Sequence, residues 1–405
     1  MGDELFDWLI SVDDHVIEPP NVWQDRLPAK YRDVGPRVVH INGTEAWVYE
    51  DKTIPTPGLS AAAGREKEEF TPAPLTYAEM RPGCYDAKAR LEDMNRDGVL
   101  ASLCFPSFPR FAGQTFYEAN DKQLALLCVK AYNDWMLEEW AGAAPGRFIP
   151  GILIPLWDPP EAAKEIERTA AMGAKALIFT ENPAPLGLPS LHDRGGYWDP
   201  VWAACQETDM PVCCHIGSSS QLPTTAPDAP FIVTVTLTPM NAATTCADWL
   251  FSGNFIRFPK LKLCLSEGGI GWIPYILERA DYTLDRQGHW SAKNDVKIDF
   301  GAEGISIEIR ESDRAHYFER PPSELFKEHV YGCFIDDNCG IESLDVIGVD
   351  NVMIETDYPH TDSTWPNSRE NARKRLAGRS AEDIEKILRA NAKRVFNFEP
   401  AAMPS

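Results

Sequence analysis

Six acidic or imidazole side chains lie at the downstream ends of five separate apolar runs of this 405-residue chain. Carboxylate oxygens and imidazole nitrogens bind divalent metals, and an oxygen-rich set suits iron or manganese better than zinc. A carboxylate is also costly to bury unless it is paired or bound to a metal. The chemistry of these residues therefore predicts a metal centre. They are Asp13, His15, Glu181, His215, Glu267 and Asp357.

The segment SVDDH contributes two of these side chains from a single strand. Side chains alternate across a strand, so Asp13 and His15 point the same way while Asp14 points the opposite way. The D-x-H spacing is a weak signal when taken alone, because Asp often ends strands. His215, which ends the run PVCCH, is by itself more typical of a hydrogen-bonded histidine than of a ligand. The prediction of a metal centre therefore depends on these residues meeting in space.

The elements that bring them together are short apolar runs separated by segments of helical periodicity. This alternation predicts a parallel sheet buried on both faces, and eight such strands close a (β/α)8 TIM barrel. The carboxyl ends of the strands then converge on one mouth, where residues distant in sequence share a site. The eight runs are 9–15, 98–107, 147–157, 174–181, 211–217, 261–269, 329–337 and 351–360.

We expect one barrel domain over residues 1–405 with two insertions. The first follows strand one, at about 16–96, and contains RVVHINGTEAWVYED, whose alternation predicts a hairpin. The second follows strand six, at about 286–325. Long insertions at a barrel mouth are often functional, so both are expected to act as lids or to form a subunit interface.

The charge balance restricts the partners. Thirty-nine basic against 61 acidic residues give a formal net charge of -22 and leave no basic run for phosphates, so nucleic acid is not an expected partner. The same charge repels anionic membranes, and no apolar stretch approaches the ~20 residues that cross a bilayer. The opening MGDELFDWLI lacks the basic segment of a secretory signal. These features predict a soluble, cytoplasmic protein.

Five segments together resemble the amidohydrolase superfamily, in the branch that includes aminocarboxymuconate-semialdehyde decarboxylase and gamma-resorcylate decarboxylase. They are SVDDHVIEPP, the His of CCHIG, LCLSEGGIGWIPYILERAD, IETDYPH and the closing ILRANAKRVF, and they span nearly the whole chain. The resemblance implies that Asp13, His15, His215 and Asp357 hold a divalent metal.

Two positions depart from the mononuclear pattern of that branch. Glu267 stands where many relatives carry a histidine, and Glu181 stands where dinuclear amidohydrolases present a bridging carboxylated lysine. The ligand set is thus closer to that of dinuclear, oxygenase-like members, and it favours two divalent ions, iron or manganese, over a single zinc or manganese. The alternative is structural: Glu181 ends its strand in a solvated turn, and Glu267 caps the following helix.

The reaction that these residues favour is hydroxylation of a small polar substrate with dioxygen at a dinuclear iron or manganese centre. Asp357 and Glu267 are the expected catalytic residues, and His360 is expected to orient Asp357 or to contact the substrate. One alternative is metal-assisted hydrolysis or non-oxidative decarboxylation of a carboxylated substrate, with Asp357 handling the proton. Another is a non-catalytic partner of an active paralogue. We expect a homo-oligomer or a hetero-oligomer with a paralogous subunit.

Overall fold

The barrel predicted from the sequence is the core of the structure. The computed structural model describes residues 4–301, 304–312 and 319–402. Its parallel strands form two hydrogen-bonded sets, in the orders β1-β5-β6 and β14-β13-β10-β9-β8-β7. The strands are β1 (Leu9–Val16), β5 (Val99–Pro106), β6 (Phe148–Ile149), β7 (Gly151–Ile152), β8 (Ala176–Thr180), β9 (Val212–His215), β10 (Leu263–Ser266), β13 (Val330–Phe334) and β14 (Val352–Ile354).

The two sets join into a closed ring. Between β6 and β7 the third barrel strand is broken at Pro150, which has no N–H to donate, so β6 pairs with β5 and β7 pairs with β8. On the other side, Asp357 N–H donates to Asp13 O at 2.9 Å and His15 N–H donates to Tyr358 O at 2.6 Å. These bonds close β14 onto β1. The predicted (β/α)8 barrel is therefore confirmed.

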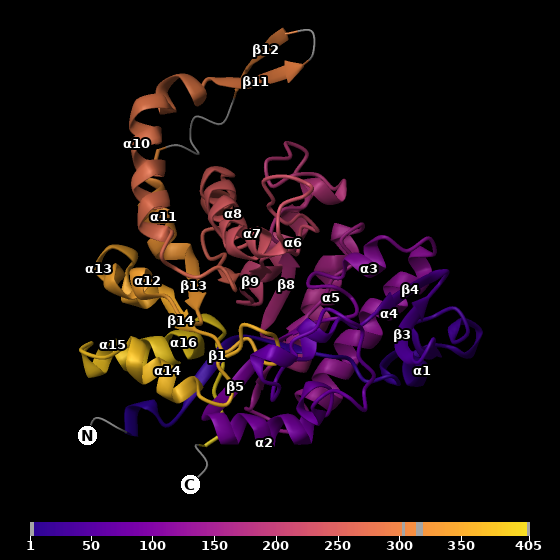
Figure 1. The fold of residues 1–405 in the computed structure, drawn as a ribbon. Coiled ribbons are helices and arrows are strands. Elements are labelled where there is room, and N and C mark those ends of the chain that lie inside the picture. The colour runs from indigo at the N-terminus through magenta and orange to yellow at the C-terminus, as the bar shows by residue number, and fades with distance from the viewer. Residues whose placement is uncertain (1–3, 302–303, 313–318, 403–405) are drawn as a thin grey trace.

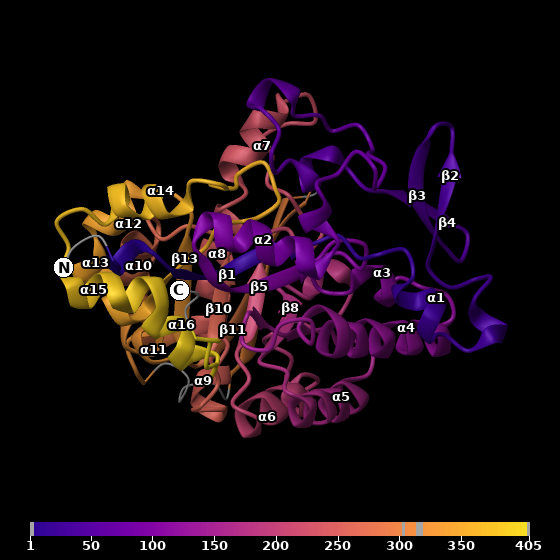
Figure 2. The same cartoon turned by 90° about the horizontal axis from the view of Figure 1, so that it is seen from below.

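The strands are buried along their whole length, as the apolar runs predicted, and helices surround them (Figures 1 and 2). Helix α5 begins where the Asp158 side chain accepts from Glu161 N–H and ends at Gly173, whose φ of 108° few other residues adopt. The longer helices are α2 (Ala87–Asp97), α4 (Lys122–Trp135), α5 (Pro159–Met172), α6 (Asp199–Glu207), α8 (Met240–Phe251), α10 (Ile273–Ser291), α11 (Pro322–His329) and α14 (Ser368–Arg375). The shorter helices are α1 (Val22–Arg26), α3 (Gln114–Tyr117), α7 (Phe231–Leu237), α9 (Asn254–Arg257), α12 (Asn338–Glu342), α13 (Leu344–Ile347), α15 (Ala381–Glu385) and α16 (Asn391–Val395).

The first insertion contains the predicted hairpin, extended by a third strand. Strands β2 (Arg37–Ile41), β3 (Thr44–Tyr49) and β4 (Lys52–Pro55) form an antiparallel sheet at the edge of the molecule, beside α1 and α3 (Figure 2). Trp47 of this sheet packs on Phe108, with ring centroids 4.7 Å apart. The insertion is thus anchored on the segment that leaves β5.

The second insertion begins inside α10. After this helix, β11 (Asn294–Gly301) and β12 (Gly304–Glu311) form an antiparallel hairpin that projects beyond the outer helices (Figure 1). Part of the segment 286–325 lies outside the described residues. The exact limits of the two insertions, and a role as lids, stay predictions.

The length and apolar character of the helices decide whether any of them could cross a membrane. Over residues 4–301, 304–312 and 319–402, none of them combines the length and the apolar character that a membrane crossing requires.

Candidate metal centre

Five of the six predicted ligands lie together at the mouth of the barrel. The Nε2 atom of His15 lies 3.5 Å from Asp13 Oδ1 and 3.2 Å from Asp357 Oδ1. It also lies 3.2 Å from His215 Nε2, which is itself 3.6 Å from Asp13 Oδ2. Ligand bonds of about 2.0–2.2 Å place neighbouring donor atoms of one ion roughly 3.0–3.6 Å apart. His15 therefore lies at ligand spacing from Asp13, His215 and Asp357, and Asp13, His15 and His215 each present a donor atom within 4.8 Å of the other two.

The two aspartates have imidazole nitrogens of His15, His215 and His360 nearby, but their oxygens accept no hydrogen bond from the described residues. Asp13 and Asp357 are fully buried, and no described group of the chain hydrogen-bonds to their oxygens. Burial, reinforced by the charges of Glu355 and Glu267, raises the pKa of Asp13 well above its ordinary value. Burial and the neighbouring Glu267 raise the pKa of Asp357 in the same direction. A divalent cation is the counter-charge that this arrangement fits.

The backbone fixes which nitrogen of His215 faces the cluster. Its Nδ1 lies 2.6 Å from the carbonyl oxygen of Ile216, so the Nδ1–H donates there and leaves the Nε2 lone pair for a metal. The ring of Phe111 lies against the same imidazole, with centroids 4.0 Å apart. The Nε2 atom of His215 is therefore oriented toward the cluster, where it is available to a metal.

Asp14 points away from the cluster, as strand alternation predicts. Its Oδ1 accepts from Thr356 Oγ1 at 2.6 Å and from Tyr358 N–H at 3.0 Å, and its Oδ2 accepts from Ser102 Oγ. These bonds tie β1 to its two neighbours in the barrel. Asp14 thereby holds the strand that presents Asp13 and His15.

Glu267 and His360 border the same centre. His15, Glu267, Asp357 and His360 each offer a donor atom, and these atoms lie within 4.8 Å of one another. Glu267 Oε2 lies 2.8 Å from His215 Nε2. Burial opposes the charged form of Glu267, but the adjacent His215 outweighs it and lowers the pKa of the glutamate. Glu267 therefore faces the centre, and it does not cap the following helix, since α10 begins at Ile273.

Two of these residues adopt unusual backbone conformations. Glu267 has a φ of 56° and Asp357 a φ of 51°, in the left-handed region that few residues other than glycine adopt. Such conformations concentrate at functional sites because the surrounding structure must hold them there.

Glu181 is not brought into this cluster. Its Oε1 accepts from Ser219 Oγ at 2.7 Å and from Asn241 Nδ2 at 3.1 Å. Ser218 Oγ accepts from Glu181 N–H at 2.8 Å, so the turn after β9 holds the glutamate from both sides. Its side chain lines a separate cavity of about 310 Å³ together with Asp248. The sequence did not show that a serine turn would hold this carboxylate.

Glu355 is a site residue that the sequence analysis missed. It is buried, and it accepts from Glu267 N–H at 3.1 Å and from Cys333 Sγ at 2.6 Å. Burial raises its pKa to about 8. The signal was present, because Glu355 precedes Asp357 by two residues, the same spacing that marked Asp13 and His15.

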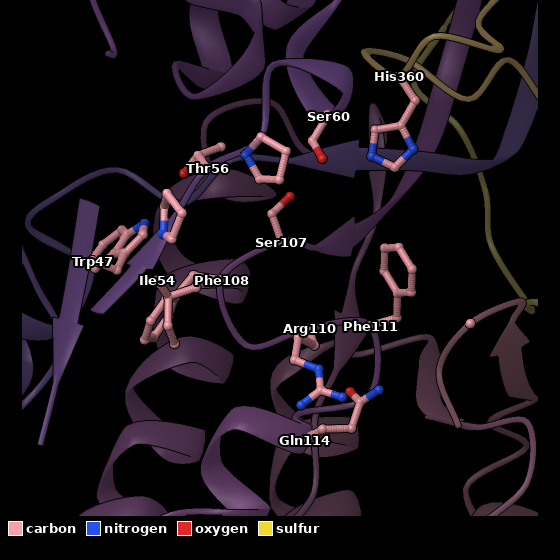
Figure 3. A pocket seen from close by; sticks show the side chains of 13 residues that line it. Trp47, Ile54, Thr56, Ser60, Ser107, Phe108, Arg110, Phe111, Gln114 and His360 are labelled. Carbon is pink, nitrogen blue, oxygen red and sulfur yellow. The ribbon is translucent and has the colours of Figure 1, made fainter. Parts of the chain in front are cut away.

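A largely apolar cavity of about 290 Å³ opens beside the centre (Figure 3). Phe111 lines this cavity and lies near the cluster, with its ring centroid 5.3 Å from that of His15. Among the described residues that line the cavity, Arg110 carries the permanent positive charge, and its Nη1 lies 2.6 Å from Glu118 Oε1. The lining includes Trp47, Ile54, Phe108, Arg110, Phe111 and His360. A second cavity of about 230 Å³ is lined by Glu267, Asp357 and His360.

The segment that follows β5 supplies much of this lining and was also missed. Ser107, Phe108, Arg110, Phe111 and Gln114 all come from it. The apolar run 98–107 predicts only a strand, because no acid or imidazole stands at its downstream end. Aromatic residues at that end carry no ligand signal, although they shape the cavity.

A closed parallel barrel with carboxylates and imidazoles gathered at its mouth defines a metal-binding TIM-barrel protein. The chain belongs to the amidohydrolase family, because the model of the family described as Amidohydrolase matches residues 39–398.

Similar proteins agree with this assignment. Gamma-resorcylate decarboxylase of Polaromonas sp. (strain JS666 / ATCC BAA-500) is 25% identical over 324 residues, which cover 75% of this chain and 88% of the relative. An amidohydrolase structure from Mycobacterium avium subsp. paratuberculosis K-10 superposes with a TM-score of 0.72 at 24% identity, covering 96% of this chain and 99% of the other. Dihydroxybenzoic acid decarboxylase from Polaromonas sp. JS666, solved with manganese and 2-nitroresorcinol, gives 0.60 at 18% identity, with coverage of 97% and 98%. The two structures share the fold of this chain.

These findings correct the predicted reaction. An oxygen-dependent hydroxylase was favoured because Glu181 was expected to bridge two metals. The curated relatives that match are gamma-resorcylate decarboxylases, so the main prediction is wrong and its decarboxylase alternative is better supported. The geometry agrees with this correction: Ser219 and Asn241 hold Oε1 of Glu181, and Glu181 offers no donor atom to the groups of possible metal ligands formed by the described residues around His15.

Proposed function

We propose that the protein is a metal-dependent, non-oxidative decarboxylase of a small aromatic carboxylate. The observation that carries this proposal is the adjacency of two features. Two buried carboxylates that accept no hydrogen bond lie with two imidazoles next to an aromatic-lined cavity, and His360 borders both the cluster and the cavity. A site of this kind can hold a cation and a flat, apolar substrate side by side.

The proposed centre binds one ion through Asp13, His15, His215 and Asp357. Glu267 and His360 then lie at its edge, where they face the substrate cavities. Manganese is the first metal to test, because it is the ion bound in the dihydroxybenzoic acid decarboxylase of the same fold. The intact ligand set also favours an active enzyme over a catalytically silent partner subunit.

The cavity supports a substrate of one aromatic ring. Its volume of about 290 Å³ lies at the lower end of the range for small-molecule sites, roughly 300–1,000 Å³. Phe108, Phe111 and Trp47 give it flat apolar walls, and Arg110 at its border offers a donor for an anionic group. The names of the relatives, gamma-resorcylate and dihydroxybenzoic acid decarboxylase, point to the same substrate class.

The reaction breaks the bond between the ring carbon and the carboxyl carbon, releases carbon dioxide and places a proton on the ring carbon. When bound, the metal supplies a Lewis acid that anchors oxygens of the substrate. Phe111 and Arg110 orient the ring against the apolar walls of the cavity. Glu267, Asp357 and His360 face the smaller cavity, so they are the groups placed to hold the proton that the ring receives.

The test is decarboxylation by the manganese-loaded protein. A panel of hydroxylated and methoxylated benzoates is incubated with the enzyme, and carbon dioxide and the matching arene are quantified. We expect equimolar release from at least one member, abolished by His215→Ala. His192→Ala is the matched control, since His192 pairs with Asp248 outside the cluster and its loss should leave turnover intact. Turnover that persists in His215→Ala, or no release from any benzoate, overturns the proposal.

A further inference from the structure

The hairpin formed by β11 and β12 has one apolar face that is exposed to solvent. Its strands pair over their full length, and three cross-strand pairs consist only of apolar residues. Because side chains alternate in a strand, the residues of these pairs share one face. Their exposed fractions run from 36% to 79%. The pairs are Val296 with Ile309, Ile298 with Ile307, and Phe300 with Ile305.

The opposite face of the hairpin is charged. Asp295 lies opposite Arg310, and Lys297 lies opposite Glu308. Lys297 also forms an ion pair with Asp299 at 2.8 Å. The hairpin is therefore amphipathic, with a solvated face and a face of the kind that strands elsewhere turn toward a core. Within residues 4–301, 304–312 and 319–402 nothing buries that face, and the hairpin projects past the outer helices (Figure 1).

We propose that this apolar face binds the same face of a second copy of the chain, so that the protein is a twofold dimer joined through its β11–β12 arms. An isolated two-stranded hairpin is at best marginally stable in water. Its exposed apolar rows would also promote aggregation unless they are covered. The partner must therefore be present whenever the chain is folded, and a second copy always is.

The uncharged composition of this face favours an identical partner over a basic one. The chain carries a formal net charge of -22, which makes copies repel one another and would attract basic proteins. The six apolar residues offer no charge or hydrogen-bonding side chain that a different, basic partner would recognise. An uncharged, self-matching patch is what two acidic copies need for an isologous contact about a twofold axis.

The hairpin face alone is too small for a stable interface, so we expect the interface to continue onto α10. Two paired eight-residue strands cover roughly 250 Å² on one face, from the strand rise and spacing. A stable interface buries about 800 Å² per partner. Helix α10, which leads into the hairpin, exposes further aromatic side chains, with Tyr275 at 70%, Tyr282 at 51% and Trp290 at 49%. Tyr275 and Tyr282 are two helical turns apart on one side of the helix, so the apolar surface extends along it.

The first test is the oligomeric state of the full chain by sedimentation velocity at micromolar concentration. We expect a dimer for the wild type and a folded monomer for the double variant Ile298→Glu, Ile307→Glu, since neither side chain packs on the barrel. The matched control Lys297→Ala, Glu308→Ala changes the charged face of the same two strands and should remain dimeric. A monomeric wild type, or a double variant that stays dimeric, overturns the proposal.

The second test locates the contact without weakening it. Cys339, the exposed native thiol, is first replaced by serine. In that background, Ile298→Cys should be joined between copies by a short bis-maleimide, because the twofold axis passes through the middle row of the face. Lys297→Cys, one residue away on the charged face, should not be joined. Equal cross-linking of the two variants, or none of Ile298→Cys, contradicts face-to-face packing. Neither test depends on the proposed catalytic activity.

Discussion

The imidazole rings of His15 and His360 are stacked, with centroids 3.6 Å apart and ring planes 19° from parallel. His360 Nδ1 also lies 3.1 Å from Asp357 Oδ1. One histidine thus contacts two proposed metal ligands and borders both substrate cavities. This arrangement links metal binding to the position of the substrate.

Replacing His360 should show whether it serves metal binding or the reaction of the substrate. We expect His360→Phe to keep the stack on His15 and about one equivalent of manganese, while kcat falls roughly 10²- to 10⁴-fold because a proton-handling group is lost. Metal content is measured by mass spectrometry and kcat by carbon dioxide release. Loss of the metal in His360→Phe would instead make His360 a ligand, as its place beside His15, Glu267 and Asp357 also permits.

Removal of a proposed ligand, in contrast, should weaken manganese binding. Asp357→Asn takes one buried charge from the cluster, and we expect manganese affinity to fall by more than the roughly 10- to 100-fold that loss of an outer contact costs. Glu181→Gln is the matched carboxylate control, because the side chain lies outside the cluster. A loss of metal in Glu181→Gln equal to that in Asp357→Asn contradicts the one-ion assignment.

Metal binding should strengthen as the pH rises. Burial raises the pKa values of Asp13 and Asp357, so in the metal-free protein these groups hold protons at pH values where ordinary aspartates have lost them. A metal must displace those protons. We expect the dissociation constant of manganese to fall by about tenfold or more per pH unit over part of the range from pH 5 to 8, with proton release detected by calorimetry in two buffers. A dissociation constant that is flat over this range contradicts the prediction.

Glu18 should make stability depend on pH. Its carboxylate is buried under the β5 loop, where it accepts from the N–H groups of Ser107 and Phe108, and burial raises its pKa to about 7 from an ordinary 4.5. Between these values the folded chain binds more protons than the unfolded chain, so the free energy of unfolding falls as the pH rises from 4.5 to 7, by about 3 kcal/mol in total.

The variant Glu18→Gln removes this titration, and denaturant unfolding at several pH values should show a flatter dependence than in the wild type. Glu342→Gln, at an exposed position, should leave the wild-type slope unchanged. If the free energy of unfolding of Glu18→Gln depends on pH as steeply as that of the wild type, groups other than Glu18 cause the dependence.

Phe111 should act on substrate binding more than on metal binding. Phe111→Ala removes one wall of the cavity, and a loss of about 1.4 kcal/mol in binding corresponds to a tenfold rise in KM. Phe111→Leu keeps an apolar wall and should recover most of the affinity. Steady-state kinetics with constant metal content checks this result, and an unchanged KM in Phe111→Ala would place the substrate elsewhere.

The barrel could be predicted from the sequence because strands that are buried on both faces appear in it as continuous apolar runs. Runs such as the ALIF of β8, which only Thr180 follows in that strand, are apolar, and Asp13 and His15 can be assigned to one side of β1 from alternation alone. The convergence of His215 and Asp357 with them follows once eight strands are counted. Glu267 required the structure, since a carboxylate before two glycines fits a cap equally well.

Glu181 shows where such reasoning fails. Its position at the end of β8 is correct for a ligand, but the direction of its side chain is decided by Ser219 and Asn241, which are distant in sequence. The aromatic lining from Phe108 and Phe111 was missed for a related reason, because a hydrophobic residue in a loop has no periodicity to mark it. Strand position is thus encoded locally, while side-chain direction depends on tertiary contacts.

The most direct test of the proposed chemistry is a parallel assay of carbon dioxide release and oxygen uptake by the manganese-loaded enzyme on its best benzoate substrate. We predict that carbon dioxide and the arene form in equal amounts at the same rate under strict anaerobiosis and in air, with no oxygen consumed. Turnover that stops without oxygen, or that consumes it in proportion to product, would contradict a non-oxidative decarboxylase.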